Sequence, residues 1–383
     1  MRLCVISNPN SIHTHRWVDY FVGRGHEVTL IGDLPLRRAA PVGVDYVDLP
    51  GRQRGGKMRY AGWARSVRRI VRELRPDVLH AHYIASTGWL GAAAGYHPFL
   101  VTAWGSDLLV NAQRSVVQRQ LARWVLRSAD YVTCVSENLA TVAQQLGADP
   151  GRLEVAPWGV DTEVFRAADD RDVLRGKLGI EQALTVMSIR SIKPVYNPLV
   201  IADAFGLVAQ QEPAARFIVR THNSNPDLLA AFRRRIDSAG AARSVSYTGD
   251  LADDRAIAEG YAASDIAVSV PSSDGTPSSV LEAMACGAVP VLSDLPSLHE
   301  WVSDGQDGLF VPVGDAGALA AAILRLVRDE ELRSRLQANS AATIRSRGDR
   351  THLMRRAEEI YETLAAGKNP WPAGPEVQLF GKS

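Results

Sequence analysis

Short β-rich runs alternate with helical patterns along almost the whole of this chain of 383 residues. Parallel neighbouring strands need a long crossover between them, which is usually a helix, so this alternation is typical of parallel sheets with helices on their faces. In the first half of the chain, the predicted strands lie at residues 2–8, 26–33, 44–50, 77–83, 98–105, 131–136 and 153–159.

The alternation stops once and then restarts. A polar helical stretch follows Phe165, and further strands are predicted at 184–190, 215–221, 244–249, 265–272, 289–294 and 308–313. We therefore predict an α/β protein with two doubly wound parallel-sheet domains, at residues 1–166 and 167–345. Residues 367–383 have the Pro/Gly composition of a loosely ordered tail. Because ligands of open parallel sheets bind beyond the carboxyl ends of the strands, we expect function in a central cleft that the two domains face.

Composition excludes several classes. The formal net charge of +1 gives no general reason to expect nucleic-acid binding. Three scattered cysteines, Cys4, Cys134 and Cys286, fit neither a disulfide framework nor a zinc motif, and we expect them to be reduced core residues. The N-terminus does not resemble a signal peptide, and no apolar run reaches about 18 residues. A cytoplasmic protein is expected, and the Ala- and Arg-rich composition suggests a bacterial source.

One segment, SSDGTPSSVLEAMACGAVPVLSD at 272–294, places an acidic residue in a loop and another in the helix that follows. Asp274 comes directly after a predicted strand. The next three residues, Gly275, Thr276 and Pro277, form a tight loop. Ser278 or Ser279 is placed to cap the helix that begins there.

The start of that helix suits a phosphate, because its backbone N–H groups lack helical partners and its dipole presents about half a positive charge. Glu282 lies about one turn inside the helix, on a face that can look back toward the loop. Asp274 and Glu282 would then flank a bound diphosphate as acceptors for hydroxyl groups, which describes a nucleotide sugar. The plainer alternative is that Asp274 caps a turn and Glu282 is solvated.

The stretch PSSDGTPSSVLEAMACGAVPV resembles the acidic motif of the retaining glycosyltransferases of family four, which have the GT-B fold with two Rossmann-like domains. The usual motif is Glu, seven residues, Glu, then Ala-Met-Ala-x-Gly-x-Pro-Val, and this chain differs in having Asp274 as the first acid. The resemblance implies that Asp274 contacts the hydroxyls of the donor sugar and that Glu282 contacts the ribose of the nucleotide.

The likeness extends from residue 1 to about 330. SIHTHRWVDYFVGRGHEVTL, RPDVLHAHY, VTAWGSDLL and VAPWGVDTEVF are similar to family segments, with Trp104 and Trp158 in place of the usual His and Asn. The resemblance also implies that a C-terminal helix, at about 346–366, packs back on the first domain. Arg190 matches the arginine that holds the donor diphosphate. The usual lysine position is Val195 here, so we take Lys193 as its substitute.

The resemblance places the acceptor on the first domain, near Asn10, His13, His82 and Asp107. His82 is preferred over His80 because it ends the predicted strand, and Asp107 is expected to orient either the acceptor or its own loop. For each histidine the alternative is a packed core residue. His80 and His82 share one face of a strand, but no third ligand follows at metal spacing, so no metal is expected.

A basic stretch, GRQRGGKMRYAGWARSVRRIVRELRP at 51–76, stands apart from the sugar-nucleotide motifs. As a helix from about Lys57 it would have Tyr60, Trp63, Val67 and Val71 opposite a row of arginines. The plain interpretation is a solvated helix face. The alternative is peripheral contact of residues 52–75 with an anionic membrane at its inner face, or with an anionic acceptor.

We predict a retaining hexosyltransferase that moves a sugar from a UDP- or GDP-type donor to the hydroxyl of a small or lipid-linked acceptor. Asp274, Glu282, Arg190 and His82 are the expected catalytic residues, and neither a metal nor another cofactor is expected. A nucleotide-sugar epimerase, a phosphorylase of the same fold, and a non-catalytic sugar-nucleotide-binding subunit remain alternatives. A dehydrogenase is disfavoured because no Gly-x-Gly-x-x-Gly follows the first strand.

Overall fold

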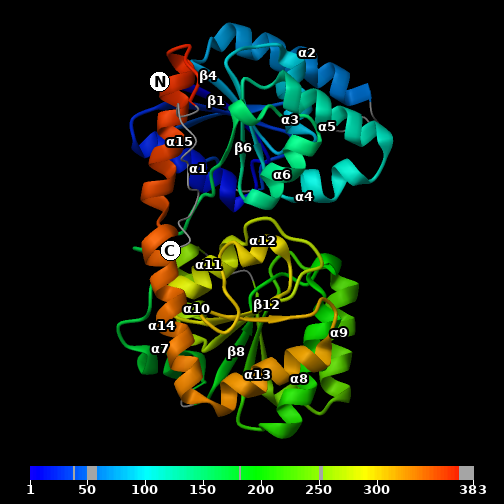
Figure 1. Cartoon of the computed structure of the whole chain (residues 1–383), viewed down its shortest axis with the longest axis vertical. Helices are drawn as coiled ribbons and strands as arrows, with labels where there is room; N and C mark the ends of the chain where they lie inside the picture. Colours follow the sequence, from blue (N-terminus) through cyan, green and yellow to red (C-terminus); the bar gives the residue numbers. More distant parts are fainter. Residues whose placement is uncertain (38, 50–57, 181–182, 250–252, 371–383) are drawn as a thin grey trace. The chain divides into compact units, whose positions relative to one another are not determined.

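The computed structural model describes residues 1–37, 39–49, 58–180, 183–249 and 253–370. The chain divides into two compact units: one contains Met1–Pro157 and the segment from His352 onward, and the other contains Trp158–Thr351. Each unit has one parallel sheet covered by helices, so the predicted α/β class is confirmed (Figure 1).

The first unit is built on a seven-stranded sheet in the order β3-β2-β1-β4-β5-β6-β7, with every neighbouring pair parallel. Its inner strands are almost wholly buried, because helices cover both faces of the sheet. The order reverses between β1 and β4, so the loops that follow these two strands lie at the switch point where such sheets bind ligands. The strands are β1 (Arg2–Ser7), β2 (Glu27–Gly32), β3 (Val44–Asp48), β4 (Val78–His82), β5 (Phe99–Ala103), β6 (Tyr131–Cys134) and β7 (Leu153–Val155).

The helices of the first unit follow from right-handed crossovers in two directions from β1, which place α1 on one face and α2, α3 and α5 on the other. Figure 1 shows α2, α3 and α5 side by side, and α3 contacts both of its neighbours. The helices are α1 (Ile12–Gly23), α2 (Met58–Leu74), α3 (Thr87–Ala94), α4 (Ser106–Leu109), α5 (Val116–Ser128) and α6 (Glu137–Gln145), with short 3₁₀ turns η1 (Asn111–Gln113) and η2 (Pro150–Arg152).

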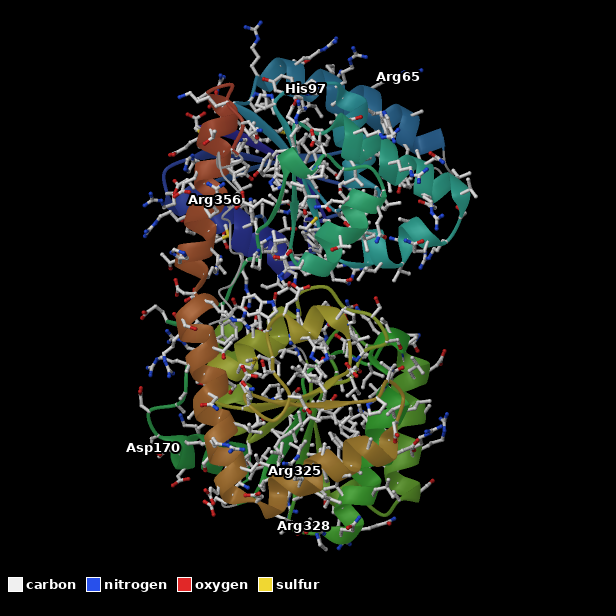
Figure 2. All side chains as sticks on the ribbon, in the orientation of Figure 1. Arg65, His97, Asp170, Arg325, Arg328 and Arg356 are labelled. Atoms are coloured by element: carbon white, nitrogen blue, oxygen red, sulfur yellow. The ribbon has the colours of Figure 1, made fainter. Side chains whose placement is uncertain are left out.

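The C-terminal helix α15 (Arg350–Ala365) lies beside α1 in the first unit (Figure 1). Trp17 Nε1–H donates to the Tyr361 hydroxyl over 3.0 Å. Arg356, labelled in Figure 2, forms two 2.8 Å hydrogen bonds to the carboxylate of Glu154, which also accepts from the Tyr131 hydroxyl over 2.9 Å. Such a bidentate pair fixes both position and orientation, so it anchors α15 to the edge strand β7.

The second unit is built on a six-stranded parallel sheet in the order β10-β9-β8-β11-β12-β13. Here the order reverses between β8 and β11. All strands predicted in this half are present: β8 (Thr185–Ser188), β9 (Arg216–Arg220), β10 (Val245–Thr248), β11 (Ile266–Ser269), β12 (Val289–Ser293) and β13 (Leu309–Val311).

One face of this sheet packs with α8, α9 and α13 around a core of buried apolar side chains that includes Phe205, Phe217 and Phe232. Asp or Asn side chains cap the starts of α7, α9, α10, α13 and α14 by accepting a backbone N–H. The helices are α7 (Arg171–Leu178), α8 (Pro198–Gln211), α9 (Pro226–Ser238), α10 (Asp254–Ala263), α11 (Ser278–Ala285), α12 (Pro296–His299), α13 (Ala316–Arg328) and α14 (Glu330–Arg347), with 3₁₀ turns η3 (Pro194–Tyr196) and η4 (Ala242–Ser244).

Residues 158–166 are predicted from the sequence to belong to the first domain, but they lie in the second unit. Val160 explains this placement: its N–H donates to the carbonyl of Gly348 over 2.8 Å, and its carbonyl accepts from Arg350 over 2.9 Å. The Phe165 ring also lies 6.3 Å from that of Tyr261, between centroids. All three cysteines are buried and unpaired with one another, as expected of core residues.

Candidate functional site

The loops after β8 and β11 meet at the switch point of the second sheet, because these strands are hydrogen-bonded neighbours. Asn197 holds the two loops together. Its side-chain amide donates to the Val270 carbonyl over 2.9 Å, and its amide oxygen accepts from the Ser272 hydroxyl over 3.1 Å. Ser272 N–H in turn donates to the Val195 carbonyl over 2.8 Å. Residues 84 positions apart in the sequence, such as Arg190 and Asp274, are thereby brought into contact.

Arg190 is the centre of this site. Its Nη1 lies 3.2 Å from Asp274 Oδ2 and donates to the Ser279 hydroxyl over 3.1 Å. The guanidinium also lies over the Tyr196 ring, with Cζ 4.2 Å from the ring centroid. Burial, the largest single influence, acts to lower the pKa of Arg190, but the Asp274 carboxylate together with Tyr196 and Tyr261 outweighs it, and the pKa is raised overall. The site therefore keeps a fixed positive charge, which stacking and hydrogen bonding hold in one orientation.

Asp274 is also tied to its own loop. Its Oδ1 accepts the Gly275 N–H over 2.9 Å, and its carbonyl accepts the Ser297 hydroxyl over 2.8 Å. The side chain is only 13% exposed. Ser297, buried in the short helix α12, was not identified from the sequence, because no local pattern indicates that α12 packs under this loop.

Glu282 lies in the second turn of α11 and is 5% exposed, so the alternative of a solvated glutamate is wrong. The expected serine cap is also wrong: Pro277 occupies the N-cap, no side chain caps the helix, and Ser278 and Ser279 are its first two residues. Ser279 instead accepts from Arg190. The guanidinium consequently lies at the helix start, where backbone N–H groups and the helix dipole also favour an anion.

Lys193 lies in the same loop as Arg190, half-buried, immediately before the 3₁₀ turn that contains Tyr196. Its ammonium has neither a hydrogen bond nor an ion pair with any residue that the structure describes. Thr276 and Pro277 complete the loop before α11. Tyr196, like Ser297, was missed, since the stacking of an arginine on an aromatic ring six residues later depends on the turn between them.

At the switch point of the first sheet, His82 ends β4 and contacts β1. Its Nδ1 lies 3.4 Å from the Ser7 hydroxyl, which also pairs with the Thr14 hydroxyl at 2.7 Å. The His82 ring lies 5.0 Å from Trp17 and 5.4 Å from Trp104, between centroids. Burial, with a smaller contribution from His13, lowers the pKa of His82 to about 3. His82 is therefore a neutral imidazole near pH 7, and a weak base.

His80 is a packed core residue, which was the alternative to a site role for each histidine. Its Nδ1 pairs with the Tyr361 hydroxyl and its Nε2 with the Thr102 hydroxyl, each at 2.6 Å. Burial, and then the nearby His82, lowers its pKa well below the ordinary value. His82 is buried to the same extent, 1% exposed like His80, so its role as a site residue stays a prediction.

His13 and Asn10, two further residues predicted to lie near the acceptor, differ in how far their side chains are engaged within the protein. His13 lies in the first turn of α1, half-buried, with its ring 5.9 Å from that of Trp104. Asn10 is used to tie loops together: its amide donates to the Pro35 carbonyl and its oxygen accepts the Arg37 N–H, both over 2.7 Å. Both ends of the Asn10 side chain are therefore engaged within the protein.

Asp107 orients its own loop, the second of the two roles expected for it. The carboxylate is buried and accepts backbone N–H groups of Trp104, Gly105 and Leu108 from one loop and of Ile84 from another. Burial raises the pKa of Asp107, although these four hydrogen bonds act in the opposite direction. The loops after β4 and β5 are thus held together by one carboxylate.

Neither a metal cluster nor a membrane-spanning helix is found in the described part of the chain. Among the residues that the structure describes, no group of three or more His, Cys, Asp and Glu side chains is arranged to hold a metal ion. None of the described helices combines the length and the apolar character needed to span a bilayer.

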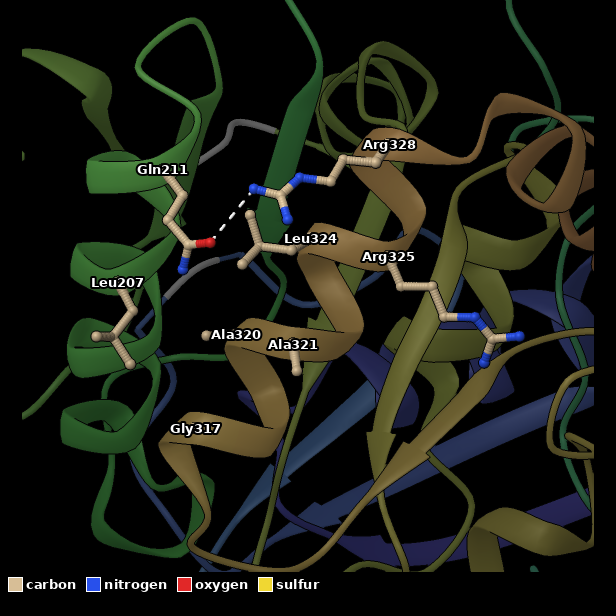
Figure 3. Close-up of a pocket in the computed structure, with 8 residues that line it drawn as sticks. All are labelled: Leu207, Gln211, Gly317, Ala320, Ala321, Leu324, Arg325 and Arg328. Atoms are coloured by element: carbon tan, nitrogen blue, oxygen red, sulfur yellow. Dashed lines mark hydrogen bonds between the residues drawn. The ribbon is translucent and has the colours of Figure 1, made fainter.

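A groove of about 470 Å³ lies between α8 and α13 on the second unit (Figure 3). Its lining is Leu207, Gln211, Gly317, Ala320, Ala321, Leu324, Arg325 and Arg328, and it includes no predicted site residue. Arg328 spans part of it by donating to Gln211 over 3.3 Å, and Arg328 also pairs with Glu212 at 2.7 Å. This groove is separate from the site around Arg190.

The two buried histidines predict a pH dependence of stability. The pKa of His82 is about 3 in the folded chain and about 6.5 in the unfolded chain. Between these two pH values the unfolded chain therefore binds more protons than the folded chain. The free energy of unfolding should therefore fall with pH in this range, by up to about 1.4 kcal/mol per pH unit for each histidine. Urea unfolding of the native chain and of His82→Asn, between neutral and mildly acidic pH, measures this. An equal slope in both proteins would contradict the assignment.

Two family models match this chain, one in each of its two units. The family model described as Glycosyl transferase 4-like matches residues 2–136, and the model described as Glycosyl transferases group 1 matches residues 170–343. The chain is 31% identical over 280 residues to the D-inositol 3-phosphate glycosyltransferase of Geodermatophilus obscurus, an alignment that covers 67% of this chain and 61% of that protein. It is 27% identical over 349 residues to the Rhodococcus opacus protein of the same name, covering 80% and 75%. The alignment with the first relative thus spans less than two thirds of its length.

Solved structures share the fold. Sucrose-phosphate synthase from Thermosynechococcus elongatus superposes with a TM-score of 0.83 at 18% identity, covering 96% of this chain and all of that one (100%). The HepE protein of Anabaena, solved in complex with UDP-glucose, superposes with a TM-score of 0.79 at 18% identity, covering 95% and 100%. Together with the two family models, which match most of the chain, these likenesses show that the chain belongs to the group 1 glycosyltransferases of family four and has their GT-B fold.

Proposed function

We propose that this chain transfers a sugar from a nucleoside-diphosphate donor to an acceptor hydroxyl with retention of the anomeric configuration. The observation that carries the proposal is the position of Arg190, which lies at the start of α11, at the switch point of the sheet, between Asp274 and Ser279. A permanently charged guanidinium at the N-terminus of a helix matches a diphosphate, and two carboxylates on the same loop and helix match the hydroxyls of a sugar and a ribose.

In this proposal the second unit holds the donor. Arg190 and the start of α11 bind the diphosphate, with Lys193 as a second cation. Asp274 accepts from the sugar hydroxyls and Glu282 from the ribose. Because Asp274 pairs with Arg190 in the structure, donor binding exchanges part of that ion pair for contacts with phosphate and sugar. The UDP-glucose in the HepE structure makes UDP sugars the first donors to test, with GDP sugars next.

The first unit binds the acceptor in this proposal, through His13, His82 and the loops that Asp107 and Asn10 hold. The C1–O bond to the diphosphate breaks, and the acceptor oxygen bonds to C1 on the same face.

With a pKa of about 3, His82 is poorly suited to take the acceptor proton near pH 7, so the proton goes to the departing phosphate oxygen. His82 then acts by contacting the acceptor. The rate enhancement comes mainly from positioning and from stabilising the charge that develops on the diphosphate, and no resident metal or cofactor is invoked.

The relatives suggest an acceptor to try first. Their name specifies D-inositol 3-phosphate, a phosphorylated polyol, and we include it in the acceptor panel with other polyols and lipid-linked sugars. The basic stretch 52–75 remains a candidate for contact with a membrane at its inner face. Residues 52–57 of it lie outside the described residues, and residues 58–74 form α2, with Arg65, Arg68 and Arg72 exposed.

The experiment is a donor screen by mass spectrometry with UDP, GDP and dTDP sugars. The native chain should give acceptor transfer or slow donor hydrolysis with at least one donor. Glu282→Ala should lose affinity for that donor by about tenfold to a hundredfold, because a buried carboxylate that binds a ribose hydroxyl is removed. Glu259→Ala, an exposed glutamate on α10, is the matched control and should behave like the native chain.

Other outcomes identify the alternatives. Interconversion of donor sugars without an acceptor would indicate an epimerase, and turnover that requires inorganic phosphate would indicate a phosphorylase. Donor binding in calorimetry with neither transfer nor hydrolysis would contradict the proposal and indicate a non-catalytic binding subunit.

A further inference from the structure

Helix α5 exposes apolar side chains on its outer side. Val116 is 74% exposed, Val117 66% and Trp124 42%. On its other side, Ala122, Val125 and Leu126 are buried in the first unit. The helix is therefore apolar both toward the core and toward solvent, and only the core side is covered.

The exposed residues share one stripe. Trp124 lies two turns after Val116 and Val117, and Leu121, half-buried, lies between them at the helical spacing. Single exposed apolar residues are ordinary on protein surfaces, but a stripe that contains a tryptophan indicates a surface that something covers.

Arginines surround this stripe. Arg114, Arg119 and Arg127 are exposed and Arg123 is half-buried, while residues 112–129 contain no Asp or Glu. Arg119 donates to Gln113 over 2.7 Å, and within the described residues none of the four arginines forms an ion pair with an acid. The positive charge is therefore available to an anionic partner.

The nearby helix α2 adds further exposed arginines to the positive charge on this face of the first unit. It packs on α3, which also packs on α5, so the three helices lie side by side on one face of the first unit (Figure 1). The buried side of α2 contains Trp63, Val67 and Val71. Its exposed side contains Arg65, labelled in Figure 2, with Arg68, Arg69 and Arg72, and its one described acidic neighbour, Glu73, lies 4.0 Å from Arg69.

We propose that the outer side of α5 docks on an anionic lipid bilayer, with Val116, Val117 and Trp124 entering the interface and the arginines of α5 and α2 contacting the headgroups. An apolar stripe bordered by cations, with a tryptophan at its edge, is the pattern of interfacial helices. A second copy of the chain fits the surface poorly, because a symmetric contact would bring two sets of arginines together. None of these residues belongs to the sugar-nucleotide site, so the proposal stands independently of glycosyl transfer.

The test is co-sedimentation of the full chain with vesicles of phosphatidylcholine, with and without phosphatidylglycerol, at low and high salt. The native chain should bind only the anionic vesicles, and less at high salt. Removing charge by Arg119→Gln with Arg127→Gln should weaken binding about fivefold for each arginine. Removing the apolar contact by Val116→Ser with Val117→Ser should weaken it by about tenfold or more.

Matched controls lie on the second unit. Val173→Ser on α7, where the valine is 54% exposed, and Arg335→Gln with Arg345→Gln on α14 should bind as the native chain does. Brominated lipids should quench the fluorescence of the native chain more than that of Trp124→Phe. Absence of binding to anionic vesicles at low salt would overturn the proposal. So would vesicle binding that neither pair of α5 variants weakens, or light scattering that shows a native dimer which Val116→Ser with Val117→Ser converts to a monomer.

Discussion

Arg190→Ala should reduce the affinity for the donor nucleotide by about a hundredfold or more, which corresponds to roughly 2.7 kcal/mol. Arg190 joins the loops after β8 and β11, since it pairs with Asp274 at 3.2 Å, bonds to Ser279 at 3.1 Å and stacks on Tyr196. Its removal deletes the main cation for the diphosphate and leaves the Asp274 carboxylate, only 13% exposed, as an uncompensated charge in the same place. That carboxylate would then repel the phosphates.

The substitution Arg190→Lys distinguishes charge from geometry. Lysine keeps the positive charge but neither the planar fork nor the stacking surface, so we expect an intermediate loss of about tenfold. Calorimetry with the preferred nucleotide measures both losses. Arg325→Ala in the groove of Figure 3 is the control and should bind normally, because Arg325 lines that groove and belongs to neither loop. If Arg190→Ala is folded and binds the nucleotide as well as the native chain, the assignment of Arg190 is wrong.

Asp107→Ala should destabilise the first unit by about 3 kcal/mol, because four backbone N–H groups lose their acceptor and some of them remain buried. The four donors come from two loops, after β4 and after β5, so the loss also releases Ile84 from Trp104 and Gly105. These are the loops beside His82, so the acceptor KM should rise more than the donor KM.

The neutral substitution Asp107→Asn should cost less, about 1–2 kcal/mol. Asparagine keeps one acceptor oxygen, and burial, which raises the pKa of Asp107, already opposes the charge. Urea unfolding gives the two free energies. Asp304→Ala is a useful comparison, since that aspartate accepts a single backbone N–H from Phe310 over 2.9 Å in the second unit. A loss for Asp107→Ala no larger than for Asp304→Ala would contradict the four-donor account.

The strands could be predicted from sequence because parallel strands buried on both faces are nearly continuous apolar runs, as in β5 and β12. Glu282 could be identified because its motif is local. The Arg190–Asp274 pair could not, since it depends on β8 and β11 being neighbours in a sheet whose order no local pattern states.

The local sequence led to a wrong prediction for the cap of α11 and left the role of Asp107 undecided. Serine is the commoner helix cap, but Pro277 occupies that position in α11, and Ser279 bonds to Arg190 instead. The role of Asp107 was undecided because one of its donors, Ile84, comes from a different strand connection. Burial does not separate the two histidines of β4, which are each 1% exposed; His80 is recognised as a core residue because both of its ring nitrogens pair with buried hydroxyls.

The central claim, that a nucleotide binds where the loops after β8 and β11 meet, is tested most directly by amide hydrogen exchange with and without UDP, GDP or the preferred nucleotide sugar. Slower exchange should appear in residues 189–197 and 272–282, and the α8–α13 groove should be unchanged. Protection confined to that groove, or to the first unit, with no change at 189–197 and 272–282, would contradict it.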